Sequence, residues 1–203
     1  MLECNMSSEV DICNNALGEL GAQPIMALTE STDKARYCNR FYANSRDWLL
    51  RKYDWNFAAN KATLALLATP PAYDYDHAYQ LPTLPYCLAV REFYEQRPTQ
   101  GGYDFRIIGR TIETDADAAH IRYTARITDP TQFDAMFETS LQRILIVRLC
   151  VPLGKSSAAK QLAMQDFKDS ITEAEEANAI EHYQASTEDG KIIEDEGDWL
   201  SDR

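Results

Sequence analysis

The chain has 203 residues, of which 45% are hydrophobic and 26% charged, a composition typical of a globular domain that buries a core. No apolar run approaches the roughly 20 residues of a membrane-spanning helix, and we expect no secretory signal. The formal net charge of −12 is concentrated in residues 173–203, where 11 acidic residues face two basic ones. The remaining residues are nearly balanced, which argues against DNA binding by phosphate neutralisation.

Two amphipathic helices are predicted at the start of the chain. Apolar residues recur at helical spacing after a cap at Ser7 or Ser8, and the first helix is expected to end near Leu20. After a Ser or Thr cap, a second helix is predicted from about 32 to 53. It carries several aromatic residues on its inward stripe.

Residues 58–128 are predicted to form a small antiparallel β module. The sequence between the expected first and second strands, residues 69–82, has the composition of a loop. A glycine at position 109 lies between two short β-rich segments, which is typical of a hairpin. Residues 58–67 could continue the second helix or form a strand, and we favour the strand. We also expect strands at 88–94 and 120–127, with the hairpin formed by 103–108 and 110–112.

Two further helices are predicted in residues 129–184. Asp129 and Pro130 form a cap followed by proline at the first helical position, so the third helix is expected from there to about Val151. The fourth helix is expected to run to about Tyr183 after a serine cap.

Short connections within each helix pair favour antiparallel neighbours. The predicted fold is therefore α+β: an antiparallel four-helix bundle of residues 7–57 and 129–184, with the β module of residues 58–128 inserted between helices 2 and 3. Residues 185–203 are expected to form an extended acidic C-terminal tail. The expected bundle core includes Phe41, Trp48, Phe133, Phe137, Leu141 and Phe167.

The five cysteines are an odd number with wide spacing, and none forms a metal-binding pair. Cys13, Cys38 and Cys150 fall on apolar helix faces, where a thiol acts as a small hydrophobic group. Cys87 or Cys150 could in principle work as a nucleophile with a histidine base, His77 or His120. No local signature supports that pairing.

Acidic residues provide two other candidate chemistries. Asp74, Asp76 and His77 could bind a divalent cation, although they lie in one short acidic loop. Glu92 with Glu95, or Asp104 with Glu113, could form the carboxylate pair of a glycoside hydrolase. Outward carboxylates on strands are common, so we expect no catalytic, cofactor or metal site.

Four arginines of the predicted β module could form a basic patch: Arg106, Arg110, Arg122 and Arg126. The alternatives, which we favour, are a solvated strand face or pairing with acids of a neighbouring subunit.

An ordered series of segments resembles one family. The chain resembles the tail tubular protein A type of head-to-tail adaptor of short-tailed bacteriophages, and the resemblance covers nearly the whole chain. The segments that carry it are ICNNALGELGAQPI, TDKARYCNRFYANSRDWLLRKYDWNFA, LPTLPYCLAVREFY, GYDFRIIGRTIETD, RYTARITDPTQFDAMFETSLQRILIVRLCVPL and the acidic residues 197–203.

The resemblance implies a structural virion protein and not an enzyme. Such adaptors form a ring, of twelve copies, below the portal protein of the phage head, where they extend the DNA channel without binding DNA specifically and dock the tail nozzle protein. We expect a protein made in the host cytoplasm that is monomeric until it meets the portal, with no membrane contact. The β module is expected to face the nozzle. The residues expected to dock the portal are Ile192, Ile193, Trp199, Leu200 and Arg203.

Two other functions stay open. Some relatives of these adaptors have been associated with cell-wall degradation, so the chain could be a virion-associated peptidoglycan hydrolase that uses acids of the β module. It could also be a non-viral helical interaction module whose acidic tail binds a basic partner.

Overall fold

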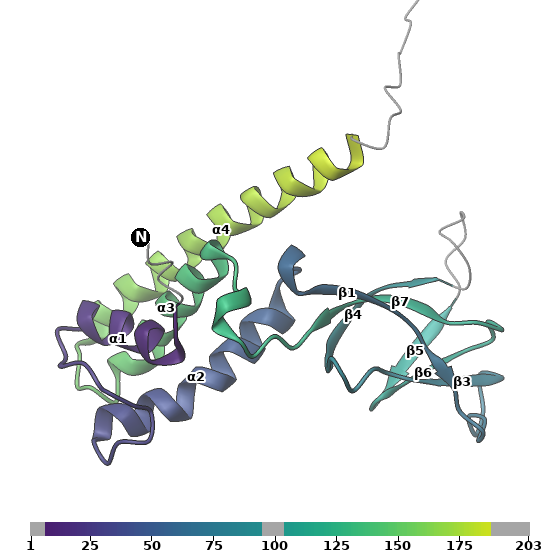
Figure 1. Ribbon diagram of the computed structural model, residues 1–203, viewed down its shortest axis with the longest axis horizontal. Helices are drawn as coiled ribbons and strands as arrows, with labels where there is room; N and C mark the ends of the chain where they lie inside the picture. Colours follow the sequence, from purple (N-terminus) through teal and green to yellow (C-terminus); the bar gives the residue numbers. More distant parts are fainter. Residues whose placement is uncertain (1–6, 95–103, 188–203) are drawn as a thin grey trace, which may run out of the picture.

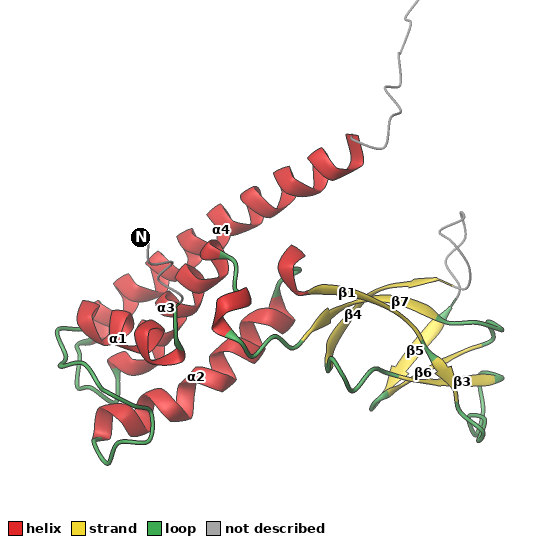
Figure 2. Cartoon of the chain, in the orientation of Figure 1, coloured by secondary structure: helices red, strands yellow, loops and turns green. Residues whose placement is uncertain are grey.

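The computed structural model describes residues 7–94 and 104–187. Helices gather at one end of the molecule and strands at the other, and the last helix projects away from the helical end (Figures 1 and 2). No helix in this described part of the chain combines the length and the apolar composition needed to cross a membrane. The residues expected to dock the portal lie outside the described residues.

The first two helices follow the sequence pattern closely. Helix α1 (Glu9–Glu19) begins after Ser8, whose hydroxyl accepts the backbone N–H of the third helical residue in a capping box. Helix α2 (Asp33–Lys52) begins after Thr32, whose hydroxyl accepts the backbone N–H of Ala35. Gly21 follows α1 with a φ of +62°, a conformation that ends helices and that favours glycine. The predictions of both helices are confirmed, because their start and stop signals are local.

The middle of the chain forms two antiparallel sheets. One sheet has the strand order β1-β7-β4 and the other β2-β3-β6-β5. A single 3-10 turn at Asn56–Ala58 comes directly before β1. After β1 the chain passes at once to β2, and so from the first sheet to the second. The strands are β1 (Ala59–Thr63), β2 (Ala65–Leu66), β3 (His77–Gln80), β4 (Cys87–Tyr94), β5 (Phe105–Ile108), β6 (Thr111–Thr114) and β7 (His120–Ala125).

Strand β3 corrects the expected loop at residues 69–82. It lies between β2 and β6, and its central residues Ala78 and Tyr79 are both buried. A strand covered on both faces shows no polar–apolar alternation, so the sequence pattern missed it. The Tyr79 hydroxyl also donates a 2.8 Å hydrogen bond to the backbone carbonyl of Ala116.

The two sheets share one small apolar core, separate from that of the helices. Side chains from both sheets meet in it, including Tyr79 and Ile112 from one sheet and Ile121 and Tyr123 from the other. The strands therefore form a unit with its own packing, and they fall within the expected β module.

Of the second pair of helices, α3 begins later than expected and α4 begins at the expected serine cap. Asp129 and Pro130 open only a 3-10 turn, Pro130–Gln132. Helix α3 (Ala135–Cys150) begins after Asp134, whose carboxylate accepts two backbone N–H groups of its first turn. Helix α4 (Ser157–Thr187) runs a few residues further than expected.

The predicted four-helix bundle is wrong. The fold is α+β with two antiparallel sheets between the pairs α1–α2 and α3–α4. Helix α3 packs against each of the other three helices, whereas α1 and α2 touch each other only slightly. Nine of the sixteen residues of α3 are buried, and they cover all sides of the helix. A bundle needs one apolar stripe on each helix, but a helix that is apolar all round becomes the centre of the packing.

The residues expected in the bundle core differ in their burial. Phe137, Leu141 and Phe167 are buried, and Phe41 and Phe133 are partly buried. Trp48 keeps 40% of its surface exposed, although its ring lies 6.2 Å from that of Phe167. The four described cysteines, Cys13, Cys38, Cys87 and Cys150, are all buried free thiols.

Helix α4 is anchored along only part of its length. Among its residues up to 180, the last buried one is Ala174, and Asn178 donates through its side-chain amide to the backbone carbonyl of Asp54. Ile180, two residues after Asn178, is 60% exposed. The following turns of α4 extend beyond the body (Figure 1).

Candidate functional site

Arginine side chains join the helices to the strands. Arg91 of β4 donates through Nη2 to the carbonyl oxygens of Leu50, Arg51 and Tyr53 at the end of α2. Its Nε donates to the Thr124 hydroxyl at 2.8 Å. The last carbonyls of a helix lack partners within the helix and carry partial negative charge. Arg91 therefore caps α2 from the sheet.

The neighbouring arginine on β7 is held between two acids. Arg122 Nη1 lies 2.7 Å from Asp54 Oδ2 and 3.3 Å from Glu92 Oε1, and the Arg122 side chain is largely buried. Asp54 also lies 3.6 Å from Arg91. Glu92, one of the candidate hydrolase carboxylates, is thus a partner in an ion pair. Its proposed companion, Glu95, lies outside the described residues.

Two further arginines stack on one tyrosine. The guanidinium carbons of Arg110 and Arg126 lie 4.1 Å and 4.3 Å from the centroid of the Tyr86 ring. Arg126 Nε also lies 2.9 Å from Asp47 Oδ2 of α2. The expected pairing with a neighbouring subunit is therefore corrected for Arg122 and Arg126, because their acids come from the same chain.

The candidate metal ligands pair with other groups. Asp74 binds Arg106 at 2.9 Å, and His77 Nε2 lies 3.6 Å from an oxygen of Asp117. Within residues 7–94 and 104–187, no group of three or more metal-ligating side chains comes together. The structure does not bring Asp74, Asp76 and His77 together as a metal centre.

The candidate nucleophile and base residues are separated. Cys87 lies opposite Ala125 at one end of β7, whereas His120 is at the other end and hydrogen-bonds Thr63 at 2.9 Å. Five residues of strand span about 16 Å. Cys150 is buried in α3, and burial raises the pKa of both thiols. The two cysteines therefore serve as packing residues.

The other carboxylate pair lies on the β5–β6 hairpin. Glu113 is directly opposite Arg106 in the ladder, and Asp104 immediately precedes β5 on the same face. Arg106, the ladder neighbour of Glu113, forms its ion pair with Asp74. A cation therefore lies on the same face of the hairpin as the two candidate acids.

A groove among three helices is the strongest candidate for a functional site. It has a volume of about 540 Å³ and lies where α2, α3, the turn after α3 and the start of α4 meet. We call it the cationic groove. Its lining residues are Tyr37, Arg40, Phe41, Ile144, Val147, Arg148, Val151, Pro152, Lys160 and Met164.

The floor of the cationic groove is apolar. Ile144 and Val147 of α3 are buried beneath it, and Phe41 of α2 is partly buried. Val151 is 64% exposed and Met164 of α4 is also exposed. Apolar side chains that line a concave surface and remain uncovered mark binding sites.

Three cations surround this floor without a carboxylate partner in the described structure: Arg40, Arg148 and Lys160. Arg148 is half-buried, and its guanidinium carbon lies 5.9 Å from the centroid of the Trp48 ring. Burial lowers the pKa of Arg148. A guanidinium removed from water without a counter-charge is unfavourable, which favours an anionic ligand. The cationic groove thus offers the chemistry to bind an acidic segment with apolar anchors.

The sequence reasoning did not find the cationic groove. Its cations come from three different helices, so no local pattern groups them. One signal was present: Arg148 interrupts the apolar run ILIVRLCV in the central helix. An arginine in a helix buried on all sides points to a surface where that burial is incomplete.

The sequence matches no model of a known protein family, and a search of curated proteins finds no match.

Proposed function

We propose that this protein is a structural head-to-tail adaptor of a short-tailed phage, a component of the virion. Copies of it would form a ring under the portal, extend the DNA channel and dock the tail nozzle. The ordered segments that resemble tail tubular protein A adaptors support this function. The structural observation that carries it is the presence of two differently built ends (Figure 2). Each end has exposed apolar side chains.

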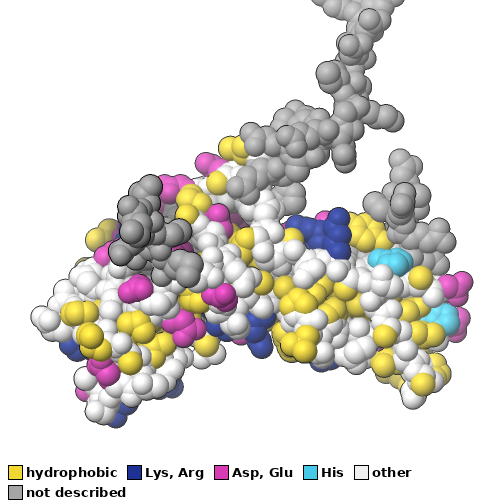
Figure 3. All heavy atoms as spheres, viewed as in Figure 1, with side chains coloured by type: hydrophobic (Ala, Val, Ile, Leu, Met, Phe, Trp, Pro, Cys, Tyr) yellow, Lys and Arg dark blue, Asp and Glu magenta, His cyan; other side chains and the backbone are white. Residues whose placement is uncertain are grey.

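At the strand end, large apolar side chains are exposed in several loops and edge strands. Leu84 is 94% exposed, and hydrophobic side chains gather over the strand end in Figure 3. Exposed apolar surface of this kind is typical of sites that contact another protein. Under the name strand-end patch we group the exposed large apolar residues of the strand region, which lie in loops and on both edge strands of one sheet: Leu66, Tyr73, Leu84, Ile107 and Ile108.

At the helical end, the projecting part of α4 provides a second docking surface. A connector has to bind two different neighbours at once, so it needs two surfaces that do not overlap. In this proposal the strand-end patch contacts the nozzle and the helical end contacts the portal. Portal docking by the residues expected from the sequence stays a prediction.

The charge distribution is compatible with passage of DNA. The strand arginines Arg106, Arg122 and Arg126 are each paired with carboxylates of the same chain. Because paired guanidinium groups have little charge left for phosphates, such a surface would not hold DNA tightly. A ring also requires one heterologous contact repeated around a closing rotation.

The test is to mix the purified chain with portal protein from the same phage and to image the complexes by electron microscopy. We expect an added ring below the portal, and a further ring after addition of the nozzle protein. An absence of association with the portal would overturn the proposal.

A double variant at the strand end tests which end of the molecule contacts the nozzle and which contacts the portal. Ile107→Glu with Ile108→Glu changes only exposed positions of β5, so the fold should be kept. We expect this variant to join the portal and to lose the nozzle, because buried charge at an apolar interface is unfavourable. Loss of portal binding with retained nozzle binding would reverse the assigned orientation.

A further inference from the structure

We propose that the cationic groove of one copy binds the acidic segment 188–203 of a second copy. This contact needs neither the portal nor the nozzle, and it is an alternative to the portal docking expected for the same apolar residues. Its occupant is a segment of the same sequence, and charge, apolar content and reach each support the pairing.

Charge is the first observation. Residues 188–203 contain seven acidic residues against Lys191 and Arg203. The cationic groove contributes Arg40, Arg148 and Lys160, which have no carboxylate partner in the described structure. Complementary charges of this kind steer association and set the register of a bound segment.

The apolar content is the second observation. Ile192 with Ile193, and Trp199 with Leu200, interrupt the acidic residues as two apolar pairs. A bound peptide gains most of its affinity from a few such anchors that enter an apolar pocket. The uncovered floor of the cationic groove, with Val151 exposed at its edge, provides apolar surface for them.

The length of chain between Thr187 and Trp199 indicates whether the acidic segment binds the groove of its own copy or that of a second copy. The groove includes Lys160 near the start of α4, and helix α4 carries the chain to Thr187. These 27 residues of helix span about 40 Å. Trp199 lies 12 residues after Thr187, and 12 fully extended residues reach at most about 43 Å.

Met164, the other lining residue on α4, lies about 35 Å from Thr187. A segment returning to its own groove would therefore have to run nearly fully extended back along α4, with about 8 Å left for the turn. The first apolar pair, which follows Thr187 by five and six residues, would reach about half of that distance. The groove of a second copy carries no such constraint. Because each copy offers one segment and one groove, the contact is heterologous and links copies head to tail.

A mixed-isotope cross-linking experiment tests this pairing on the full chain. Trp199 is replaced by the photoreactive residue p-benzoylphenylalanine in unlabelled protein, which is mixed with uniformly ¹⁵N-labelled protein and irradiated. We expect adducts that join position 199 of a light chain to groove peptides of a heavy chain. Adducts only within one chain, adducts only outside the groove, or none would each overturn the proposal.

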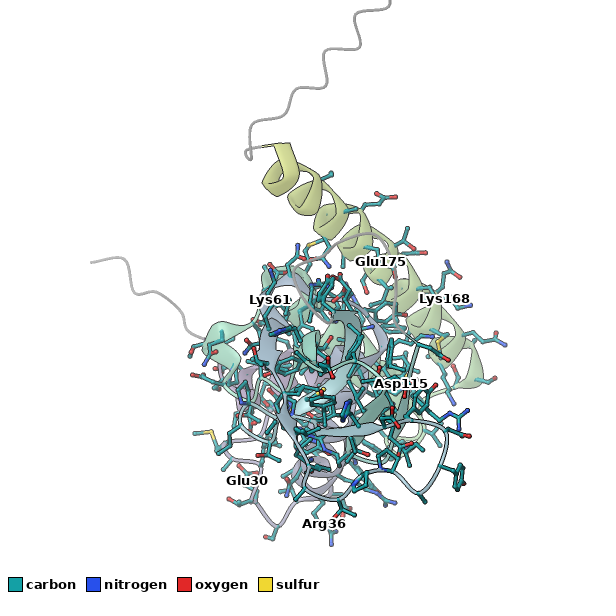
Figure 4. All side chains as sticks on the ribbon, turned by 90° about the vertical axis from the view of Figure 1, so that its right-hand side faces the viewer. Glu30, Arg36, Lys61, Asp115, Lys168 and Glu175 are labelled. Carbon is teal, nitrogen blue, oxygen red and sulfur yellow. The ribbon has the colours of Figure 1, made fainter. Side chains whose placement is uncertain are left out.

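Charge variants identify the groove as the receptor. Arg148→Glu with Lys160→Glu in the heavy chain should lower the yield of light–heavy adduct about tenfold, because repulsion replaces attraction. The matched control is Lys168→Glu, a change of the same kind on the same helix, where Lys168 projects outward from α4 (Figure 4). An equal effect of the control would overturn the proposal.

A compensating change separates a direct contact from damage to the fold. Lys160→Glu in the heavy chain is combined with Glu196→Lys and Asp198→Lys in the light chain. We expect the swapped charges to recover at least half of the wild-type yield, with unchanged circular dichroism spectra. A yield that stays low while both spectra are native would overturn the proposed contact.

Discussion

The junction of α2 with the sheet and the cationic groove are both rich in arginine, but their arginines differ in their partners. At the junction, Arg91 binds helix carbonyls and Arg122 lies between two carboxylates. In the groove, Arg40 and Arg148 contact aromatic rings at 5.9 Å and no carboxylate within the described residues. The first set holds the two parts of the molecule together, whereas the second leaves positive charge for a ligand.

This difference shows why burial and pairing have to be considered together. A buried guanidinium with several acceptors loses stability when it is removed, because its acceptors are left unpaired. A half-buried guanidinium without a counter-charge loses part of its hydration and gains no ion pair. It therefore adds little to the stability of the isolated subunit. Loss of stability on mutation therefore distinguishes the two sets experimentally.

The largest effect is expected from Arg91→Ala. The change removes four hydrogen-bond contacts at the end of α2 and along β7. We expect the free energy of unfolding to fall by about 3 kcal/mol, since bonds from a charged donor are worth about 1.5–3 kcal/mol each but share one side chain. Urea denaturation followed by circular dichroism measures this change.

The matched control for Arg91→Ala is Arg40→Ala at the rim of the cationic groove. Its expected effect is below about 0.5 kcal/mol, the usual range for exposed positions. Equal losses in the two variants would contradict the distinction between the sets of arginines.

A smaller effect is expected from Arg122→Ala. It leaves the carboxylates of Asp54 and Glu92 without their cation, but both acids are partly exposed to water. We therefore expect a loss of about 2 kcal/mol, below the 3–5 kcal/mol of fully buried pairs. A double-mutant cycle with Asp54→Ala should give a coupling of about 1 kcal/mol. Strictly additive losses would show that the pair contributes no interaction energy.

Arg148→Met is expected to leave stability unchanged or to raise it by up to about 1 kcal/mol, because an apolar side chain replaces an uncompensated buried charge. Methionine keeps the unbranched apolar stem that packs near Trp48. Thermal unfolding at low salt is the measurement. A loss above 1 kcal/mol would mean that Arg148 stabilises the isolated subunit.

The smallest effect is expected from Glu92→Gln. Arg122 retains Asp54 as its partner, and Glu92 is nearly half-exposed, so the loss should stay below about 0.5 kcal/mol. The same variant examines the hydrolase alternative in a peptidoglycan zymogram. Clearing by the wild-type chain that disappears with Glu92→Gln would favour the enzyme over the adaptor.

Local signals predicted the ends of the first two helices well. Ser8 and Thr32 cap α1 and α2 through backbone N–H groups only three positions away, so the information lies within one turn. The hairpin around Gly109 was predicted for the same reason, since a φ of +59° at the turn favours glycine. Strand β3 was missed because neighbours on both faces bury it.

The four-helix bundle was a wrong inference from correct helices. Short connections within each helix pair do not determine how the pairs pack on one another. The packing of the pairs was indicated instead by α3, which is apolar on all its sides. Its residues Ile144, Leu145, Ile146 and Val147 are four consecutive buried residues. No single stripe can bury such a run, so α3 lies at the centre and the other helices surround it.

By itself, the sequence determined the number and order of the helices, the position of the strand region and the acidic character of residues 173–203, because helix caps, periodicity and composition act over a few neighbouring residues. Only the tertiary structure decided which arginines are paired and which are left in a groove. Arg122 and Asp54 are 68 positions apart, and the groove cations come from three helices. Contacts at such separations depend on how complete elements pack, which local patterns do not encode.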